Sequence, residues 1–259
     1  MDVNKFIYDL NNYDLSSEYK YYEKWSEIPY PGMYKPHSGI EPTAGDAPLY
    51  YIKRDNHGYY TLFNEKICFD IKNPNTIDFN LELPDVQNTL KNLNYKQKTM
   101  AKFWGDGVPA QQWSPIFLEL FTLYNVTPPA SARILSYLQN AINDAFCITW
   151  MYKYYWNVAR PCQLDPSLIT SIPTPIFPTY PSGHSVVSAT IEVVLSFFFP
   201  DESLVIHQLT EDASISRLYG GVHFRSDLSE GLKLGRQIGN ICVEYLKTQY
   251  EIEKLIFRE

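Results

Sequence analysis

The sequence is poor in cysteine and has no apolar run long enough to cross a bilayer. Its four cysteines are scattered over 259 residues without the paired spacing of a zinc site or a disulfide framework, so we expect free thiols. The most apolar run, Val186–Phe199, contains Glu192 and is followed by Pro200. It has about 14 residues, whereas a spanning helix needs about 20. The sequence therefore predicts neither a metal–cysteine site nor a membrane segment.

An excess of positive charge is also lacking. Lys and Arg number 22 and Asp and Glu number 29, and the formal net charge of −7 argues against a nucleic-acid partner. The first residues show no basic leader with an apolar core, so no secretory signal is predicted and a cytoplasmic location is the expectation. With 45% hydrophobic residues and no internal repeat, the chain is expected to bury one core and form a single domain.

From residue 83 onward, the apolar residues recur with a helical period. Pro and Gly punctuate this pattern and predict helices over residues 85–104, 112–124, 129–158, 184–199, 202–218 and 224–253. The predicted fold is all-α, a helical bundle formed by residues 86–259. Residues 1–85 are expected to form an N-terminal extension that packs on this bundle.

Residues 1–85 are rich in Tyr, Pro and Asn and lack a sustained helical period. We expect loops there, with a short helix near the start. The runs Tyr50–Ile52 and Tyr59–Ile71 flank the turn residues Asp55–Gly58 and predict a small hairpin. The aromatic segments Tyr19–Trp25 and Pro29–Tyr34 suit three roles that the sequence leaves open: covering a pocket, forming a homodimer surface, or packing on the bundle.

Three short polar segments stand out in the helical region, and the first contains Lys153 and Arg160. If the helix over 129–158 continues to Arg160, these two cations are seven residues apart and lie on nearly the same face. Pro161 disfavours helical backbone at Arg160, which places the guanidinium at the helix end, where it can bind an oxyanion in a bidentate way. Lys153 is expected to be a buried point charge.

The second segment is Pro181-Ser182-Gly183-His184, which directly precedes an apolar helix. Ser182 is a good N-cap residue, and Gly183 allows a ligand to approach the backbone closely. The N–H groups of Gly183 and His184 would then point toward an anion at the helix N-terminus. His184, on the first turn, is placed to act as a general acid or base.

The third segment has Arg217 six residues before His223, and Asp227 four residues after it. On a helix, the Asp227 carboxylate would lie beside the His223 imidazole and accept its Nδ1 proton. That arrangement leaves Nε2 free as a nucleophile or a metal ligand. Gly220-Gly221 interrupts the preceding helical pattern, which allows Arg217 and His223 to converge from two sides of a turn.

Each segment alone also has an ordinary structural explanation: a solvated helix face, a capped turn, or a surface pair on a helix. Together they supply three cations, a hydroxyl, backbone N–H groups and two imidazoles, all within residues 153–227. These are the groups needed to hold a tetrahedral oxyanion and to carry out chemistry at its centre. The sequence therefore predicts an oxyanion site where helix ends meet.

The three segments resemble the motifs of the superfamily that unites type 2 phosphatidic acid phosphatases, bacterial acid phosphatases and vanadium-dependent haloperoxidases, whose fold is a helical bundle. The resemblance implies that His184 is the acid–base residue and that Asp227 orients His223. It also implies that His223 is either a phosphohistidine nucleophile or the axial ligand of vanadium. The residues implied to bind the oxygens of phosphate or vanadate are Lys153, Arg160, Ser182, Gly183 and Arg217.

Two aromatic residues bear on which branch the chain resembles. Trp150 and Phe177 are similar to the residues that, with His184, line the halide pocket of haloperoxidases, where Phe matches the chloroperoxidase pattern and His the bromoperoxidase one. Trp150 is equally well explained as a core residue on an apolar helical stripe. The length of 259 residues is nearer that of the compact phosphatases.

The resemblance implies vanadate as the cofactor, with phosphate able to occupy the same site. The favoured hypothesis is a haloperoxidase-like enzyme that oxidises halide with hydrogen peroxide to hypohalous acid. The alternative is a soluble acid phosphatase that hydrolyses phosphate monoesters through a phosphohistidine. A non-catalytic oxyanion-binding protein is the third hypothesis.

Overall fold

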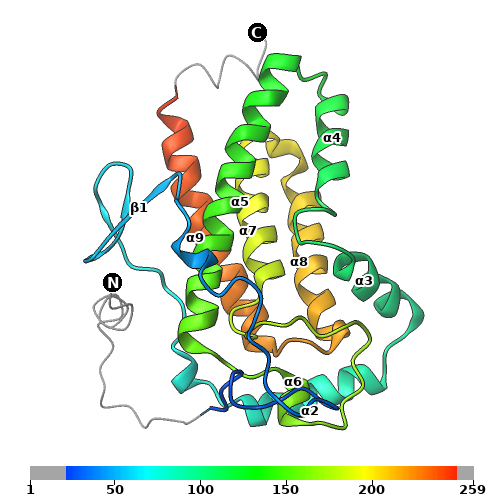
Figure 1. Ribbon diagram of the computed structural model, residues 1–259. Helices are drawn as coiled ribbons and strands as arrows, with labels where there is room; N and C mark the ends of the chain where they lie inside the picture. The colour runs from blue at the N-terminus through cyan, green and yellow to red at the C-terminus, as the bar shows by residue number, and fades with distance from the viewer. Residues whose placement is uncertain (1–21, 250–259) are drawn as a thin grey trace.

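Helices dominate the computed structural model, which describes residues 22–249 (Figure 1). They are α2 Phe79–Lys91, α3 Tyr95–Gly105, α4 Ser114–Leu123, α5 Pro128–Trp156, α6 Pro161–Leu164, α7 Gly183–Phe198, α8 Ser203–Gly220 and α9 Arg225–Lys247. Short 3₁₀ turns are η1 Ala44–Asp46, η2 Pro74–Thr76 and η3 Pro200–Glu202. The predicted all-α fold is confirmed.

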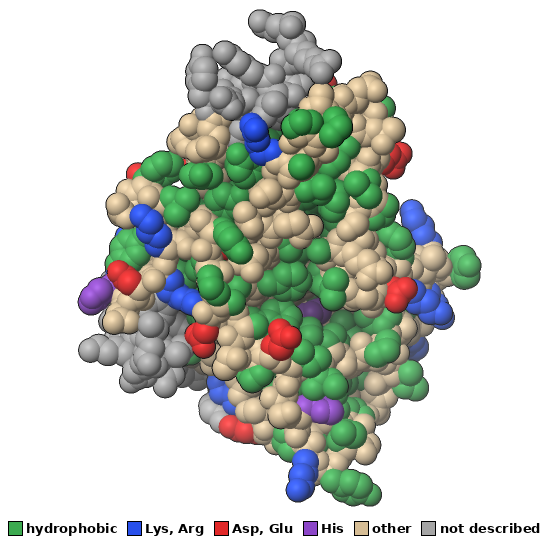
Figure 2. All heavy atoms as spheres, turned by 45° about the horizontal axis from the view of Figure 1, so that its top comes forward, with side chains coloured by type: hydrophobic (Ala, Val, Ile, Leu, Met, Phe, Trp, Pro, Cys, Tyr) green, Lys and Arg blue, Asp and Glu red, His purple; other side chains and the backbone are tan. Residues whose placement is uncertain are grey.

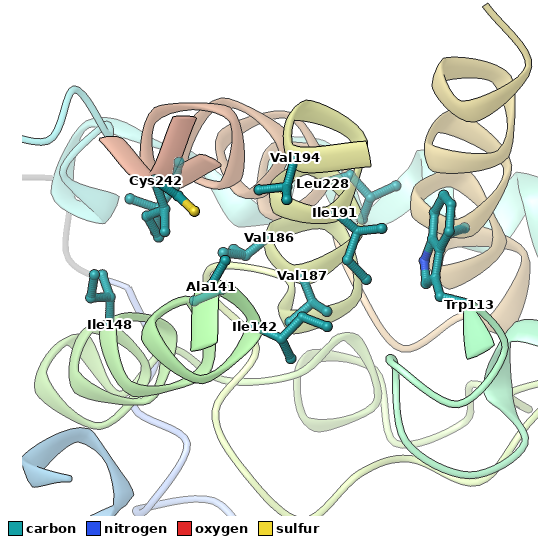
Figure 3. Packing of buried hydrophobic residues seen from close by; sticks show 14 of the residues in the cluster. Trp113, Ala141, Ile142, Ile148, Val186, Val187, Ile191, Val194, Leu228 and Cys242 are labelled. Atoms are coloured by element: carbon teal, nitrogen blue, oxygen red, sulfur yellow. The ribbon is translucent and has the colours of Figure 1, made fainter. Parts of the chain in front are cut away.

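Helix α7 lies at the centre of the bundle and packs against α5, α8 and α9 (Figure 3). Val187, Ile191 and Val194 recur at helical spacing along α7 and are fully buried. Ala141 and Ile148 of α5 are equally buried in the same core. The C-terminal ends of α5 and α8 and the N-terminal ends of α7 and α9 therefore meet at one end of the bundle, the lower end in Figure 1.

Glycines on α9 allow α7 to approach unusually closely. Gly231, Gly235 and Gly239 recur every four residues on the face toward α7, and a Cβ added at Gly235 would lie 2.1 Å from the Val186 carbonyl oxygen. The Thr190 hydroxyl also donates a hydrogen bond of 3.0 Å to the Gly235 carbonyl oxygen. This contact fixes the N-terminal end of α7 relative to that of α9.

Replacing Gly235 with alanine is therefore expected to destabilise the protein. The methyl group cannot fit unless α7 and α9 separate, and overpacking of this kind costs about 1–3 kcal/mol, or roughly 3–10 °C in Tm for a chain of this size. Thermal unfolding followed by circular dichroism measures the effect. The control is Asn240→Ala, which truncates an exposed side chain on the same helix. An unchanged Tm for Gly235→Ala would contradict the close packing.

The predicted hairpin is confirmed and has a third strand. Strands β1 Ile52–Asp55, β2 Gly58–Thr61 and β3 Lys66–Ile67 form an antiparallel sheet in the order β1-β2-β3. Asp55 pairs with Gly58 at the turn, where the sequence predicted it. The second strand ends at Thr61 instead of continuing toward Ile71. The short helix expected near the start of the chain lies outside the described residues.

Several predicted helix boundaries are wrong. The last helix, expected to run to residue 253, ends at Lys247. The helix expected over 85–104 is two helices, because Asn94 and Gln97 form a capping box that begins α3. Helix α2 begins at Phe79, after the N-cap Asp78, and continues through residue 85. Helix α5 ends at Trp156, because Asn157 adopts a left-handed conformation with φ of 55°.

The aromatic residues near the described start of the chain contact the segment that follows α5. The Tyr22 hydroxyl donates to the Trp156 carbonyl oxygen at 2.9 Å, and the backbone N–H of Trp25 donates to the Asn157 carbonyl oxygen at 2.8 Å. The Tyr30 hydroxyl donates to the Pro175 carbonyl oxygen at 2.6 Å. Tyr34 is fully exposed. These contacts agree with the packing role considered for this segment, whose residues Tyr19–Tyr21 lie outside the described part of the chain.

Two further expectations can be compared with the structure. Within residues 22–249, no helix combines the length and the apolar character that crossing a membrane requires. The four cysteines are free, as expected; Cys68 is exposed, and Cys147, Cys162 and Cys242 are buried.

Candidate active site

The structure brings the predicted site residues together at the end of the bundle where four helix ends meet. Trp150 and Lys153 lie on the last turns of α5, and Arg160 lies in the extended segment that follows. The other residues come from the N-terminal turn of α7, the last turn of α8 and the start of α9. Because α7 packs against each of the other three helices, these segments are held in one place.

Lys153 and Arg160 are both fully buried and bind backbone carbonyl groups. The Lys153 ammonium donates to the carbonyl oxygens of Pro178 at 2.8 Å and Thr179 at 2.7 Å. The Arg160 guanidinium donates through Nε to the Phe177 carbonyl oxygen at 2.9 Å, whereas its buried Nη2 has no hydrogen-bond partner. The sequence allows a helix that continues to Arg160, but α5 ends before this residue. Arg160 precedes the short helix α6 in extended backbone, with φ of −80° and ψ of 157°.

Arg217 is the third cation, and it reaches the site from the last turn of α8. Its Nη2 donates to the Ala101 carbonyl oxygen at 2.9 Å, and its Nε donates to the Ser216 hydroxyl oxygen at 2.9 Å. Helix α8 ends at Gly220, two residues beyond the predicted end at 218, because Gly221 takes a left-handed conformation with φ of 74°. The chain then turns back, so that Arg217 and His223 both line one cavity.

His223 is held by Asp227 on one side of the ring and by Arg160 on the other. Its Nδ1 lies 2.8 Å from Asp227 Oδ2, and Arg160 Nη1 lies 3.0 Å from its Nε2. Since a guanidinium can only donate, Nε2 is the acceptor and Nδ1 carries the proton. The predicted pair is thus formed, although His223 precedes α9, which begins at Arg225, and does not lie on that helix.

Thr179 is a site residue that the sequence interpretation missed. Its hydroxyl donates to Asp227 Oδ2 and lies 3.0 Å from His223 Nδ1, and its carbonyl oxygen accepts from Lys153. One residue therefore positions a cation, a carboxylate and an imidazole. Its place two residues before Pro181 in the second polar segment was the available signal. A threonine hydroxyl in a loop, however, is too common to indicate such a role without coordinates.

The N-terminal turn of α7 has the predicted cap. The Ser182 hydroxyl accepts from the Ser185 N–H, and the Ser182 N–H donates to the Asp227 carbonyl oxygen at 3.0 Å. His184 Nε2 lies 2.8 Å from the Trp104 carbonyl oxygen, so this nitrogen carries the proton and Nδ1 is the acceptor in the neutral ring. Gly183 and His184 line the same cavity as His223.

Burial and mutual repulsion lower the proton affinity of the basic groups in this site. Burial, reinforced by Arg160, lowers the pKa of Lys153 well below its usual value and that of Arg217 to about 9. Burial and neighbouring cations also lower the pKa of both His184 and His223 well below 6.5. Burial raises the pKa of Asp227 to about 7, against the lowering effect of Thr179 and the cations. Both imidazoles are therefore neutral at pH 7.

These shifts predict how stability depends on pH. As the pH falls below 6.5, the unfolded chain protonates both histidines before the folded protein does, because their pKa values are lowered in the folded protein. Asp227, whose pKa is raised to about 7, takes up its proton in the folded protein first. The unfolded state thus binds more protons in total, so stability in anion-free buffer rises with pH by about 1.4 kcal/mol per pH unit for each net proton.

Urea unfolding at several pH values between 4 and 6.5 measures this slope. His223→Gln is expected to reduce this slope by up to about 1.4 kcal/mol per pH unit, which corresponds to one proton, because a group that unfolding would protonate has been removed. His57→Gln, which changes an exposed histidine, is the control and should leave the slope unchanged. Equal slopes for the native protein and His223→Gln would contradict the lowered pKa of His223.

A cavity of about 580 Å³ opens over these residues. Gly183, His184, Arg217 and His223 line one end of it, together with Phe177. Lys153, Arg160 and Ser182 are not among the lining residues; they lie behind this surface. The Phe177 ring lies against the cations, with its centroid 5.2 Å from Lys153 Nζ and 5.0 Å from Arg160 Cζ. The Trp150 ring centroid is 4.9 Å from that of Phe177.

The family comparison agrees with this geometry. Residues 133–251, which contain all three polar segments, match the model for the PAP2 superfamily. This part of the chain is similar to the PAP2 superfamily. A search of curated proteins found no match.

Solved structures resemble this part of the chain together with the region before it. The crystal structure of a bacterial vanadium-dependent iodoperoxidase matches with a TM-score of 0.69 and 24% identity over 93% of this chain. An apo-type bacterial vanadium-dependent chloroperoxidase matches with a TM-score of 0.66 and 14% identity, covering 97% of this chain and 70% of that one. Aquifex aeolicus LpxE matches with a TM-score of 0.53 and 20% identity, covering 65% of this chain and 98% of that one.

At these identities the similarity establishes the fold, so the bundle expected from the superfamily resemblance is confirmed. This chain spans 64% of the length of the iodoperoxidase chain. The match to the two peroxidases extends over the N-terminal region before the PAP2 match, whereas the match to LpxE covers about two thirds of this chain.

Proposed function

We propose that this protein is an oxyanion-binding enzyme of the phosphatase and haloperoxidase class, and that it acts as a vanadium-dependent haloperoxidase. The observation that carries this proposal is the charge of the site. Lys153, Arg160 and Arg217 are buried around His223, and Asp227 is the carboxylate that faces them in the described part of the chain. A bound anion of two or more charges would neutralise the excess positive charge.

The residues present fit vanadate or phosphate. Arg160 Nη2 is buried without a partner and can donate to an anion oxygen, and Arg217 reaches the cavity directly. The backbone at Gly183 leaves space, because a Cβ there would approach protein atoms no closer than 3.8 Å. The anion oxygens would be held by Lys153, Arg160, Ser182, Gly183 and Arg217. His223 Nε2 would be the ligand to the metal, once Arg160 Nη1 releases it.

Bound vanadate would supply a Lewis-acidic centre at which hydrogen peroxide can oxidise a halide to hypohalous acid. The protein groups have separate tasks around it. His184, which lines the cavity and whose Nδ1 is the accepting nitrogen, would take and return protons. The three buried cations would stabilise negative charge at the bound anion. Asp227 and Thr179 would hold the His223 ring in the tautomer with a free Nε2.

Two observations support a haloperoxidase over a phosphatase. The Phe177 and Trp150 rings lie against one another beside Lys153 and Arg160, which provides an apolar wall where a weakly hydrated halide could approach the cations. The similarity to an iodoperoxidase and a chloroperoxidase also extends over 93% and 97% of this chain.

The alternative is hydrolysis of a phosphate ester, and the tautomer of His223 favours it as a second candidate. An unprotonated Nε2, with Nδ1–H bound to Asp227, is the form needed to attack phosphorus in line. His184 would then protonate the leaving oxygen.

An assay with two substrates separates these functions. Purified full-length protein, stripped of metal, would be given orthovanadate and hydrogen peroxide with iodide, bromide or chloride. In parallel it would be given 4-nitrophenyl phosphate. Vanadate-dependent halide oxidation would support the haloperoxidase. Hydrolysis that vanadate inhibits, without halide oxidation, would support the phosphatase and overturn the first proposal. If neither activity is found, the remaining hypothesis is a non-catalytic oxyanion-binding protein.

A further inference from the structure

The cavity is larger than an oxyanion and a halide require. Its volume of about 580 Å³ falls in the range of pockets that bind organic molecules, roughly 300–1,000 Å³. His184, Arg217 and His223 occupy one end. The rest of the space extends away from them along α5, where the walls are mainly apolar.

One wall is a stripe on α5. Asn143, Phe146, Cys147 and Trp150 occur at positions i, i+3, i+4 and i+7 and line the cavity in turn. Other lining residues come from parts of the chain outside the PAP2 match, including Ile40 and Ala44 near η1 and the loop 107–109. Hydrophobic side chains gather over the centre of the face in Figure 2, where a histidine side chain lies recessed among them.

Residues 40–47 and the loop 107–109 form the roof of the cavity. Polar groups near this roof mostly form hydrogen bonds that hold it in place. Trp150 Nε1 donates to the Ile40 carbonyl oxygen at 3.2 Å, and Asn143 Nδ2 donates to the Pro48 carbonyl oxygen at 2.9 Å. These bonds fix the roof to α5, so the cavity is already formed, and they leave mainly hydrocarbon surface facing its interior.

Three aromatic rings form a continuous row along the cavity. The ring centroids of Phe146 and Trp150 are 5.7 Å apart, and those of Trp150 and Phe177 are 4.9 Å apart. All three side chains are only partly buried and line the cavity. The row ends at Phe177, directly beside Lys153 and Arg160. Because neighbouring rings are inclined by 68° and 47°, a flat organic molecule can stack on one of them and meet the others edge-on, with its own edge next to the oxyanion site.

We propose that this cavity binds a flat, apolar organic molecule and holds it at the oxyanion site for reaction. This inference rests on the proposed function, which would supply the reagent. In the haloperoxidase case, hypohalous acid formed at the site transfers its halogen to an aromatic carbon of the bound molecule. A C–X bond forms, the O–X and C–H bonds break, and the released proton and hydroxide leave as water. In the phosphatase case, the same space holds the apolar group of the ester.

Binding of 2-naphthol to the full-length protein tests the cavity without vanadate, halide or peroxide. Titration calorimetry is expected to show saturable binding that Phe146→Ala weakens about 3- to 10-fold, the loss typical of one aromatic contact. Ala44→Phe, which fills the cavity from the roof, is expected to abolish binding. Phe63→Ala, which removes an exposed aromatic ring outside the cavity, is the matched control. Tm values show whether each variant is folded.

Turnover assays then distinguish whether the cavity holds a halogen acceptor or the apolar group of a phosphate ester. With vanadate, peroxide and bromide, halogenation of 2-naphthol should saturate at the concentrations that saturate binding. Phe146→Ala should raise that concentration and leave bromide oxidation without acceptor unchanged. In the phosphatase case, 2-naphthyl phosphate should be preferred over glycerol phosphate, and Phe146→Ala should lose the preference.

The outcomes separate this inference from the proposed function. If native protein does not bind 2-naphthol, or if folded Phe146→Ala and Ala44→Phe bind it as tightly as native protein does, the inference is overturned. This holds even if halide oxidation or hydrolysis is found. Binding that both variants weaken supports the cavity, even if neither activity is found and the proposed function is overturned.

Discussion

Replacing His223 with alanine is expected to lower vanadate-dependent halide oxidation by at least about 10³-fold, within the range found when a nucleophile or acid–base residue is removed. The imidazole supplies the nitrogen that would bind vanadium, and it is held between Arg160 Nη1 and Asp227 Oδ2. Alanine removes Nε2 and leaves the three cations in place. Anion binding should therefore persist in weakened form while turnover is lost.

The experiment measures both quantities on one protein preparation. Initial rates of iodide or bromide oxidation give the loss of turnover, and calorimetric titration with orthovanadate gives the remaining affinity. His57→Ala, a change at an exposed histidine, should match the native protein in both. If His223→Ala retained more than about a tenth of the native rate, His223 would not be the vanadium ligand. The same variant should also lose any hydrolysis of 4-nitrophenyl phosphate.

Replacing Lys153 with methionine is expected to weaken phosphate or vanadate binding by about 2–5 kcal/mol, or roughly 30-fold to several thousand-fold in Kd, because a buried charged donor is lost. Without the anion, the same substitution should change stability little. The lost hydrogen bonds to the Pro178 and Thr179 carbonyl oxygens are offset by removal of a desolvated charge that Arg160 repels. The anion-bound and anion-free proteins should therefore respond differently.

Thermal unfolding with and without phosphate shows this difference. Native protein should gain Tm as phosphate is added, since a ligand that binds the folded state stabilises it. Lys153→Met should show a much smaller gain from a similar starting Tm. The control is Lys98→Met, which removes an exposed lysine on α3 and should behave like native protein. A full phosphate response in Lys153→Met would mean that Lys153 does not contact the anion.

The helical fold was predictable because its apolar residues repeat with the period of a helix. The centre of α7 is an example: Val187, Ile191 and Val194 recur at helical spacing, and all three are fully buried. Helix ends that depend on local capping were harder to predict. Asn157 adopts a left-handed conformation that asparagine tolerates but does not require, so neither the end of α5 nor the extended backbone of Arg160 followed from the pattern.

The convergence of the candidate site residues was predictable from spacing, but their contacts were not. The pair of His223 and Asp227 followed from a separation of four residues, and it forms even though His223 lies outside the helix. The bond from Arg160 to His223 Nε2 and the position of Thr179 join residues 44 or more apart in the chain. Contacts at such separations depend on how the loops close, which no local pattern encodes.

The cavity joins two parts of the protein with different origins in the chain. The oxyanion end is built within residues 133–251, the part that matches the PAP2 superfamily, on helices packed face to face. The roof comes from residues 40–47 and the loop 107–109, which precede that part and rest on it through a few hydrogen bonds. On the proposed function, the reacting groups lie within residues 133–251, whereas the organic molecule would contact both that part and the roof. New acceptors could be recruited by exchanging the roof, in evolution or in the laboratory, while the chemistry is inherited unchanged.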